Sequence, residues 1–210
     1  MVSENSLSPL YQFIQEVQKL KYIDRAVLAT ESRKESSAEH CWSVGVIVWF
    51  LSDAWKKEFN TDIDVNKIIK MALMHDIIEV RVGDVSVWDK KKRLQIEQKE
   101  RDGFMSIIST LPTSLQTELA SLWNELQEGQ TLESKMVSGA DRLSAAIQRL
   151  ITKQGWVTEG HNEKDLDGIQ LPKINFSKVL LSFYNEIKQE SFNNGLLEKS
   201  SSDEISDNSK

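Results

Sequence analysis

The chain has 210 residues, 40% hydrophobic and 28% charged, which suffices for one globular domain that buries roughly 70% of its unfolded surface. The formal net charge is −6, and the one basic run, Lys90–Arg93, is followed by glutamates as on a solvated helix face. This pattern argues against a nucleic-acid polymer as partner, because phosphate backbones are bound by clustered lysine and arginine. Three prolines and nine glycines leave little room for a turn-rich β fold, so the composition favours helices.

Apolar residues recur mainly at steps of three and four, which is the spacing of amphipathic helices. The first stripe runs from Leu10 to Leu20. A second, tryptophan-rich helix begins near Ser37, a suitable N-cap, and a third ends near His75. Further helices are expected at 90–109, 113–127, 132–154 and 174–191, with Pro112 in the first turn of its helix.

Two segments differ from this helical pattern. The stretch from Gly155 to Pro172 is polar and contains glycine, and we expect a long surface loop there with a solvated His161. Residues 197–210 contain almost no apolar side chains, and we expect this tail to be disordered. Since no repeat or linker divides the remainder, the sequence predicts a single all-α helical bundle over residues 1–196.

The compartment is inferred from three features of the sequence. The single cysteine, Cys41, cannot form an intramolecular disulfide and fits a reducing compartment. The first residues lack the basic and apolar regions of a secretory signal peptide. The longest apolar stretch, Val44 to Leu51, is far shorter than the ~20 residues that span a bilayer. We therefore expect a cytoplasmic protein without a membrane partner.

The stretch from His75 to Glu79 contains the residues most suited to chemistry. His75 and Asp76 place two metal-competent side chains directly after an apolar helix, where further apolar residues or a cap would be ordinary. If the helix continues, Glu79 stands one turn from His75 on the same face. One residue can then bind a metal ion while the other reaches a water molecule on it. Asp84 follows Gly83 on what we expect to be an irregular turn.

Two weaker candidates lie elsewhere in the chain. His40 begins the tryptophan-rich helix, where a hydrogen-bonded surface histidine is the more common situation. Asp141 lies in a helix crowded with small residues, and a solvated position opposite the apolar stripe is an equal alternative. Carboxylates are, however, seldom buried unless they are paired or bound to metal. Cys41, beside His40, is expected to be a packing residue and not a nucleophile.

Together, the order His, His-Asp and Asp, spread over about a hundred residues of helical sequence, resembles the HD-domain metal-dependent phosphohydrolases. Within that superfamily the chain is similar to the 5′-deoxynucleotidase branch, which comprises bacterial enzymes acting on deoxyribonucleoside monophosphates and their eukaryotic relatives. The similarity rests on segments 35–40, 75–79, 82–84 and 140–143. The stringent-response, cyclic-dinucleotide and deoxynucleoside-triphosphate branches fit less well. Stringent-response hydrolases have an acidic pair after the His-Asp motif, whereas here Val80 follows Glu79. The cyclic-dinucleotide branch has a later Gly-Tyr-Pro, which is not present in this sequence. The deoxynucleoside-triphosphate hydrolases have further histidines, whereas only one histidine follows His75 here.

The resemblance implies a single HD-domain bundle with one divalent metal ion, bound by four side chains: His40, His75, Asp76 and Asp141. It further implies that Glu79 acts on the attacking water. Asp84 would help to position the phosphate or would supply a proton there. Arg25, on a loop after the first helix, matches a phosphate-contacting arginine of that branch. The bacterial enzymes have an aromatic residue after that arginine, next to the sugar, whereas this chain has Ala26.

The ligand atoms indicate which metal ions are suitable, and the resemblance leads to three competing hypotheses of function. Two imidazoles and two carboxylates suit Mn²⁺, Co²⁺, Fe²⁺, Ni²⁺ or Zn²⁺ better than Cu(I). The leading hypothesis is a 5′-nucleotidase that releases phosphate from (deoxy)ribonucleoside 5′-monophosphates. The alternatives are an HD hydrolase of another small phosphate ester or pyrophosphate, and a non-catalytic helical binding protein with a structural metal. Glu79 and Asp84 argue against the last, since a structural site needs no spare carboxylates. The branch also suggests a homodimer.

Overall fold

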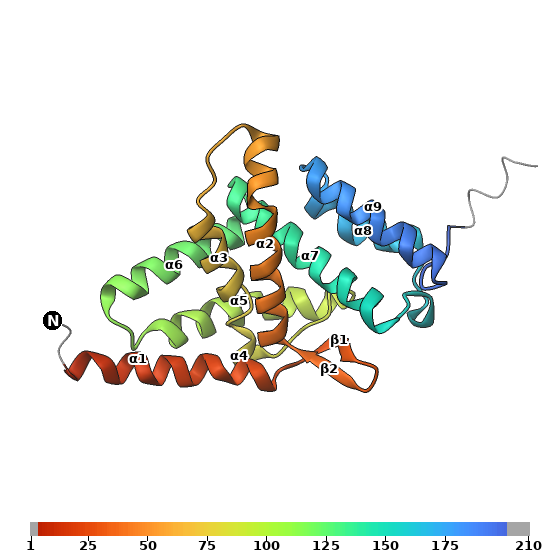
Figure 1. Cartoon of the computed structure of the whole chain (residues 1–210). Helices are drawn as coiled ribbons and strands as arrows, with labels where there is room; N and C mark the ends of the chain where they lie inside the picture. Colours follow the sequence, from red (N-terminus) through yellow and green to blue (C-terminus); the bar gives the residue numbers. More distant parts are fainter. Residues whose placement is uncertain (1–3, 201–210) are drawn as a thin grey trace, which may run out of the picture.

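The computed structural model describes residues 4–200, apart from the side chains of residues 4–6, 90, 92–94 and 96–98. Helices dominate it, as the composition and periodicity predict (Figure 1). The elements are α1 (Glu4–Val17), η1 (Gln18–Tyr22), β1 (Asp24–Thr30), β2 (Arg33–Ser36), α2 (Ser37–Phe59), α3 (Val65–Met74), α4 (Glu79–Val82), α5 (Lys90–Ile108), α6 (Thr113–Glu128), α7 (Leu132–Thr152), η2 (Val157–Glu159), α8 (Glu163–Ile174) and α9 (Lys178–Asn193). The expected all-α fold is confirmed, with one short hairpin added to it.

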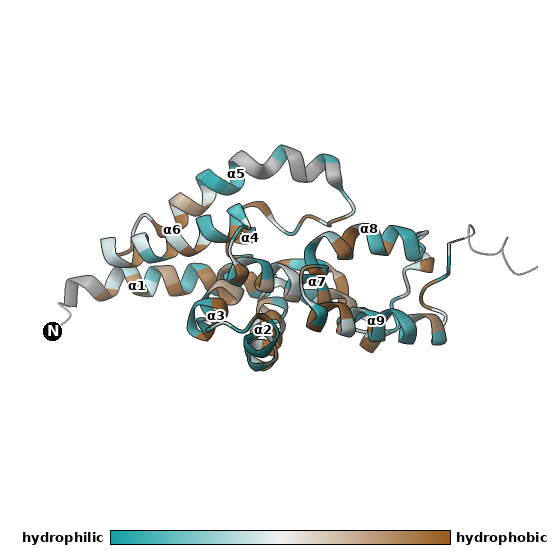
Figure 2. Ribbon diagram, turned by 90° about the horizontal axis from the view of Figure 1, so that it is seen from above, coloured by the Kyte–Doolittle hydropathy of each residue, from teal (hydrophilic) through white to brown (hydrophobic). Residues whose placement is uncertain are grey.

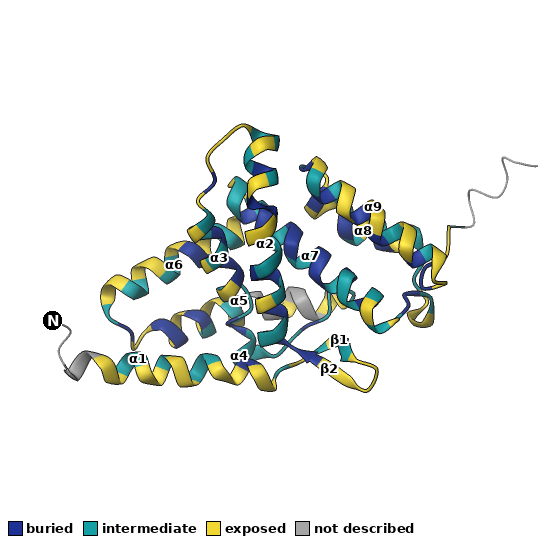
Figure 3. Ribbon diagram, viewed as in Figure 1, coloured by how far each residue is buried: buried dark blue, intermediate teal, exposed yellow. Residues whose placement is uncertain are grey.

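The main core lies where α2 packs against α3 and α7, and α7 in turn packs against α8 and α9. Each of these elements contributes large, fully buried side chains, including Trp55, Met71, Leu143 and Tyr184. Figure 3 shows buried stretches along α2 and α7. Burying such a side chain stabilises the fold by about 1.5–3 kcal/mol. The helices that carry His40 and Asp141, α2 and α7, are therefore fixed against each other by this core.

A second, smaller core lies at the other end of the molecule. Phe104 of α5 stacks on Trp123 of α6, with ring centroids 4.6 Å apart, and Ile77 and Ile78 pack against them. Figure 2 shows α1 and α6 on one side of α2 and α3, and α8 and α9 on the other. The turn after α3, which contains His75 and Asp76, thus lies between the two cores.

The antiparallel β1–β2 hairpin is absent from the sequence prediction, which placed Arg25 on a loop. Arg25 instead belongs to β1. The hairpin has few β-branched residues and is held by tertiary contacts, which commonly override local preference in strands. Gln148 of α7 donates to the Leu28 carbonyl (2.9 Å), and Gln154 accepts from the Leu28 N–H (2.9 Å) and donates to the Ala26 carbonyl (3.1 Å).

The predicted surface loop from Gly155 to Pro172 is also wrong, because most of it forms η2 and α8. A capping box between Asn162 and Asp165 begins α8. Leu166, Gln170 and Ile174 follow at four-residue steps, and all three are buried. Because this stripe has only three buried residues in a polar segment, the sequence pattern did not indicate a helix.

His161, predicted to be solvated, is half-buried and stacked on Trp88. The ring centroids lie 3.7 Å apart and the planes differ by 12°. This contact joins the segment after Asp84 to the connection between α7 and α8.

The main core continues beyond α9. Leu196 and Leu197 are buried in it, and the Trp156 N–H donates to the Leu196 carbonyl (2.8 Å). The Glu198 carbonyl accepts a further bond from the Glu163 N–H (2.9 Å). The rest of the expected tail, residues 201–210, lies outside the described residues, so the division of the chain at residue 196 stays a prediction. Between residues 4 and 200, none of the helices combines the length and apolarity needed to cross a bilayer.

Candidate metal centre and active site

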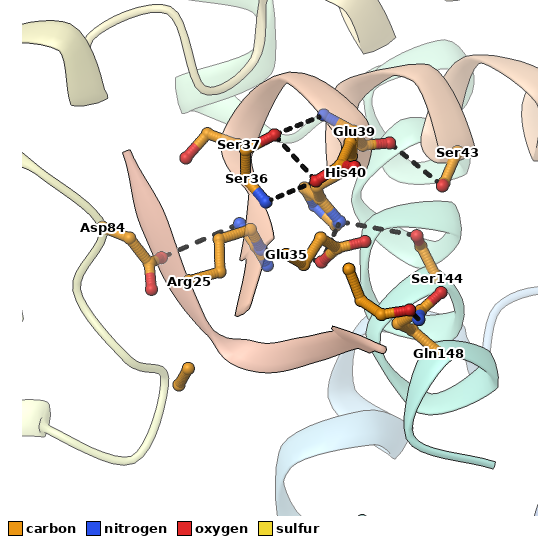
Figure 4. A network of polar contacts seen from close by, with 12 residues as sticks. Arg25, Glu35, Ser36, Ser37, Glu39, His40, Ser43, Asp84, Ser144 and Gln148 are labelled. Carbon is orange, nitrogen blue, oxygen red and sulfur yellow. Dashed lines mark hydrogen bonds and ion pairs between the residues drawn. The ribbon is translucent and has the colours of Figure 1, made fainter. Parts of the chain in front are cut away.

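The first turn of α2 positions His40. Ser36 and Glu39 form a capping box in which the Glu39 carboxylate accepts from the Ser36 N–H (2.8 Å), so the start of the helix is fixed. His40 follows, fully buried, with Ser144 Oγ 3.4 Å from its Nδ1 (Figure 4). Burial and then the charge of Arg25 lower the pKa of His40. The imidazole is therefore neutral and able to act as a ligand.

His75 caps the C-terminal end of α3. Its Nδ1 lies 2.7 Å from the Ala72 carbonyl oxygen, so Nδ1–H donates there and Nε2 faces Asp76 Oδ2 at 3.2 Å. Among the described residues, nothing forms a hydrogen bond with this buried Nε2. Burial opposes protonation of His75, but the Asp76 carboxylate outweighs it and raises the pKa well above the ordinary value. The surroundings of Nε2 thus favour a positive charge, either a proton or a metal ion.

Asp141 reaches the same place from α7, with its Oδ1 2.9 Å from His40 Nε2. Burial opposes its ionisation, but Arg142 and His40 outweigh this and hold the pKa of Asp141 well below its usual range. The small residues around it serve helix packing. A Cβ atom on Gly139 would lie 2.5 Å from Leu180 of α9.

These four side chains fit a divalent metal ion. One ligand atom each from His40, His75 and Asp76 lies within 4.8 Å of the others, and Asp141 contacts His40. Two imidazole nitrogens and carboxylate oxygens are the donors that first-row divalent metals take. The structure therefore brings together the four residues that the sequence singled out, although its contacts leave their roles as a prediction.

Arg25 lies beside this group on β1. Its Nη1 is 3.0 Å from Asp76 Oδ2 and 3.7 Å from Asp84 Oδ1, and its Nε is 3.3 Å from Glu35 Oε2 (Figure 4). Burial opposes its charge, but the carboxylates outweigh burial and raise the pKa of Arg25. The guanidinium is thus a fixed cation, held by three acidic side chains.

Glu35 was not assigned a role from the sequence, although it belongs to the segment that carries the resemblance. It is 2% exposed and contacts Arg25, and its Oε2 also lies 3.9 Å from His40 Nδ1. Burial raises the pKa of Glu35 to about 7. Glutamate is rarely buried without a partner, so its burial here indicates that it positions Arg25.

Glu79 begins α4 and faces the same group, but not as the predicted continuation of α3. The backbone from His75 to Ile78 forms tight turns, in which the Glu79 N–H donates to the Asp76 carbonyl (2.9 Å). Ser37 Oγ donates a hydrogen bond to Glu79 Oε2. Burial, and then the charge of Asp76, raise the pKa of Glu79 to about 9. Asp84 follows Gly83, whose φ of 73° marks the irregular turn that the sequence predicts.

A cavity of about 820 Å³, including space open to solvent, connects these groups. Its charged end is lined by Arg25, Asp76, Glu79, Asp84 and Asp141. The rest of the wall comes from β1, α7, α8 and the segment after Asp84. It combines apolar side chains, among them Trp88, Ala145, Ala146, Trp156 and Ile169, with the polar side chains of Ser86, Arg142, Arg149 and Gln170. A concave site that combines apolar walls with fixed charged and polar groups suits a small polar ligand.

Comparison with known proteins identifies the family. The HD-domain model matches residues 17–178, a range that contains every candidate site residue. The chain belongs to the HD-domain family. The resemblance inferred from the motifs is thereby confirmed.

Solved structures of phosphohydrolases have a similar fold. A predicted metal-dependent phosphohydrolase from Magnetospirillum magnetotacticum matches with a TM-score of 0.78 and 28% identity, covering 93% of this chain and 100% of the other. An HD-domain phosphohydrolase from Listeria innocua matches with a TM-score of 0.61 and 21% identity, covering 87% and 84%, and supports the fold alone.

Curated relatives are similar over about two thirds of the HD-domain chain. The 5′-deoxynucleotidase HDDC2 of Xenopus laevis is 29% identical over 143 residues, which are 67% of this chain and 68% of the relative. The 5′-deoxynucleotidase YfbR of Escherichia coli is 28% identical over 142 residues, 66% and 71% of the two chains.

Proposed function

We propose that this HD-domain protein is a metal-dependent 5′-nucleotidase that hydrolyses deoxyribonucleoside 5′-monophosphates, and ribonucleotides as well. One observation carries the proposal. The group of His40, His75, Asp76 and Asp141 adjoins a cavity whose charged end contains Arg25. The names of the curated relatives support the same activity.

His40, His75, Asp76 and Asp141 would hold the divalent ion. When bound, such an ion lowers the pKa of a coordinated water and neutralises charge on phosphoryl oxygens. Arg25 would bind the substrate phosphate, because a guanidinium offers two parallel N–H donors to two phosphoryl oxygens. Its contacts with Glu35 and Asp76 fix the orientation of that fork before substrate arrives.

Glu79 would hold the proton that hydrolysis must move. A water oxygen forms a bond to phosphorus while the bond to the sugar O5′ breaks, so one proton leaves the water and one reaches O5′. A carboxyl whose pKa is raised to about 9 carries a proton near neutral pH, so Glu79 can give this proton to O5′ and then take up the proton that leaves the attacking water. Ser37 holds the carboxyl in place, and Asp84 would position the phosphate through Arg25.

The sugar would lie next to Ala26, which lines the cavity beside Arg25. A methyl side chain leaves room for a 2′-hydroxyl, which is why both deoxyribose and ribose substrates are included in the proposal.

A homodimer and a cytoplasmic location complete the proposal. Trp42, Trp49 and Phe50 of α2 are 67%, 59% and 72% exposed, which suits an interface between two copies. The buried, unpaired Cys41 is consistent with a reducing compartment. Size-exclusion chromatography with light scattering tests the dimer, and a monomer at micromolar concentration contradicts it.

The activity is tested by phosphate release from a panel of 5′- and 3′-monophosphates, with added Mn²⁺ or Co²⁺ and with chelator. We expect release from the 5′-esters, little from the 3′-esters, and none with chelator. Preferred hydrolysis of pyrophosphate or of a non-nucleotide ester would support the alternative hydrolase. Metal binding without hydrolysis of any ester would support a structural metal.

A further inference from the structure

Gln170 of α8 is a buried amide in the cavity wall. It is 5% exposed, and its Oε1 atom is buried without a hydrogen bond to any of the described residues. The cavity wall also contains Ala145, Ala146 and Ile169, whose side chains offer no hydrogen-bond donor. Arg142 and Arg149 line it as well, and their buried Nε and Nη1 donors, respectively, likewise have no hydrogen-bond partner among the described residues. A buried acceptor of this kind is unfavourable unless a ligand supplies a donor.

The orientation of this amide is fixed by the backbone of α7. Gln170 Nε2 donates to the carbonyl oxygen of Arg142 at 3.4 Å. A carbonyl can only accept, so the nitrogen of the amide must face Arg142 and Oε1 must face away from it. Gln170 therefore presents an acceptor, and not a donor, on its other side.

The position of Gln170 along the cavity suits the base of a nucleotide. The phosphate end is defined by Arg25 and Asp141. Ala145 and Ala146, which line the wall, follow Asp141 by four and five residues on α7, a rise of about 6–8 Å. A nucleotide with its phosphate at Arg25 would extend its base along this wall, where Gln170 contacts the Arg142 carbonyl of α7.

We propose that Gln170 is a specificity-determining residue that accepts a hydrogen bond from the exocyclic amino group of a nucleobase. The protein then prefers cytosine and adenine nucleotides to uracil and thymine nucleotides, whose carbonyl oxygen would face the Gln170 oxygen. The inference rests on the proposed 5′-nucleotidase activity and adds the base class to it.

The test compares dCMP with dUMP, whose bases differ at the amino position, on wild-type protein and on Gln170→Met. Methionine keeps the length of the side chain and removes the amide. We expect kcat/KM for dCMP to exceed that for dUMP by about three- to tenfold in the wild type, the usual value of one neutral hydrogen bond. The variant should lose this preference while keeping its rate on 2-deoxyribose 5-phosphate, which has no base. Gln189→Met, at an exposed site on α9, is the matched control.

A second measurement does not depend on hydrolysis. Equilibrium titration of the full wild-type chain with deoxycytidine and with deoxyuridine should give tighter binding of deoxycytidine. This measurement does not need the variant, so it still tests the inference if Gln170→Met fails to fold. Equal affinities and equal rates for the two bases would overturn the inference and leave the nucleotidase proposal standing. Absence of phosphate release with a retained deoxycytidine preference would instead overturn the nucleotidase proposal alone.

Discussion

Ser37 Oγ and the Glu79 carboxylate are joined by a hydrogen bond between residues 42 positions apart. Ser37 is fully buried in the first turn of α2, and Glu79 begins α4, with the rest of α2 and all of α3 between them in the sequence. The serine thus fixes the carboxyl that we assign to proton transfer, without itself lining the cavity.

Replacement of Ser37 by alanine should lower kcat while KM for the nucleotide changes little, because the phosphate and base contacts remain. A loss of about ten- to a hundredfold is expected from a misplaced proton-transfer group. Steady-state kinetics measure the split. Ser43→Ala, on the same helix with its hydroxyl bonded to the Glu39 carbonyl, should have wild-type kinetics. A rise in KM alone would contradict the positioning role.

Replacement of Glu79 by glutamine should remove most of the turnover and leave the metal content nearly unchanged. General acid–base catalysis contributes roughly 10²–10⁴-fold, and Glu79 is placed at the water and not among the ligands. Kinetics and elemental analysis of the same preparation measure both quantities, with the exposed Glu186→Gln as control. Loss of the metal ion would make Glu79 a ligand.

The protein should bind about one divalent metal ion per chain, because the described residues form a single group of ligands. Asp141→Asn, which keeps the shape of the side chain, should bind Mn²⁺ or Co²⁺ more weakly. Binding to the folded state raises the melting temperature, so added metal should stabilise the wild type more than the variant. Full activity of metal-free protein would exclude the proposed role of this group.

Replacement of Arg25 by alanine should lower kcat/KM for nucleoside 5′-monophosphates by roughly ten- to over a hundredfold, the effect of a charge-assisted contact of ~1.5–3 kcal/mol. The loss should be much smaller with an activated aryl phosphate, whose good leaving group needs less precise positioning. Arg33→Ala lies in the same hairpin but pairs with Glu39 at the surface, and it should behave as the wild type. Equal losses on both substrates would point to a structural role for Arg25.

Replacement of Gly139 by alanine should destabilise the fold by about 1–3 kcal/mol, since the new methyl group would overlap Leu180 and approach the Lys173 carbonyl at 3.3 Å. Gly168 of α8 has open space around its Cβ position, and alanine there should be neutral or stabilising by about 0.4–1 kcal/mol. Chemical denaturation of both variants measures the difference. A stable Gly139→Ala protein would show that α7 and α9 can separate without cost.

The sequence predicted the helices with long apolar stripes and the family, because local periodicity and the His-Asp motif are properties of short segments. The burial of His40 and its contact with the half-buried Asp141, for both of which a solvated position was an alternative, depend on packing between α2 and α7 and have no local pattern. The β1–β2 hairpin was not predicted for the same reason, because its backbone is stabilised by hydrogen bonds from Gln148 of α7. In α8, only three buried positions mark the helix, and Gln170 is one of them.

The order of the elements has a consequence for biosynthesis. His40 and Asp141, in direct contact, are separated by 101 positions, and the glutamines that clamp the hairpin lie still further along the chain. At a synthesis rate of about 5–20 residues per second, α7 leaves the ribosome on the order of 5–20 s after the start of α2. During that interval the nascent chain exposes His40 and the His75-Asp76 pair without their partner carboxylate. The proposed capture of the ion by all four side chains would therefore be a late step, which follows the docking of α7.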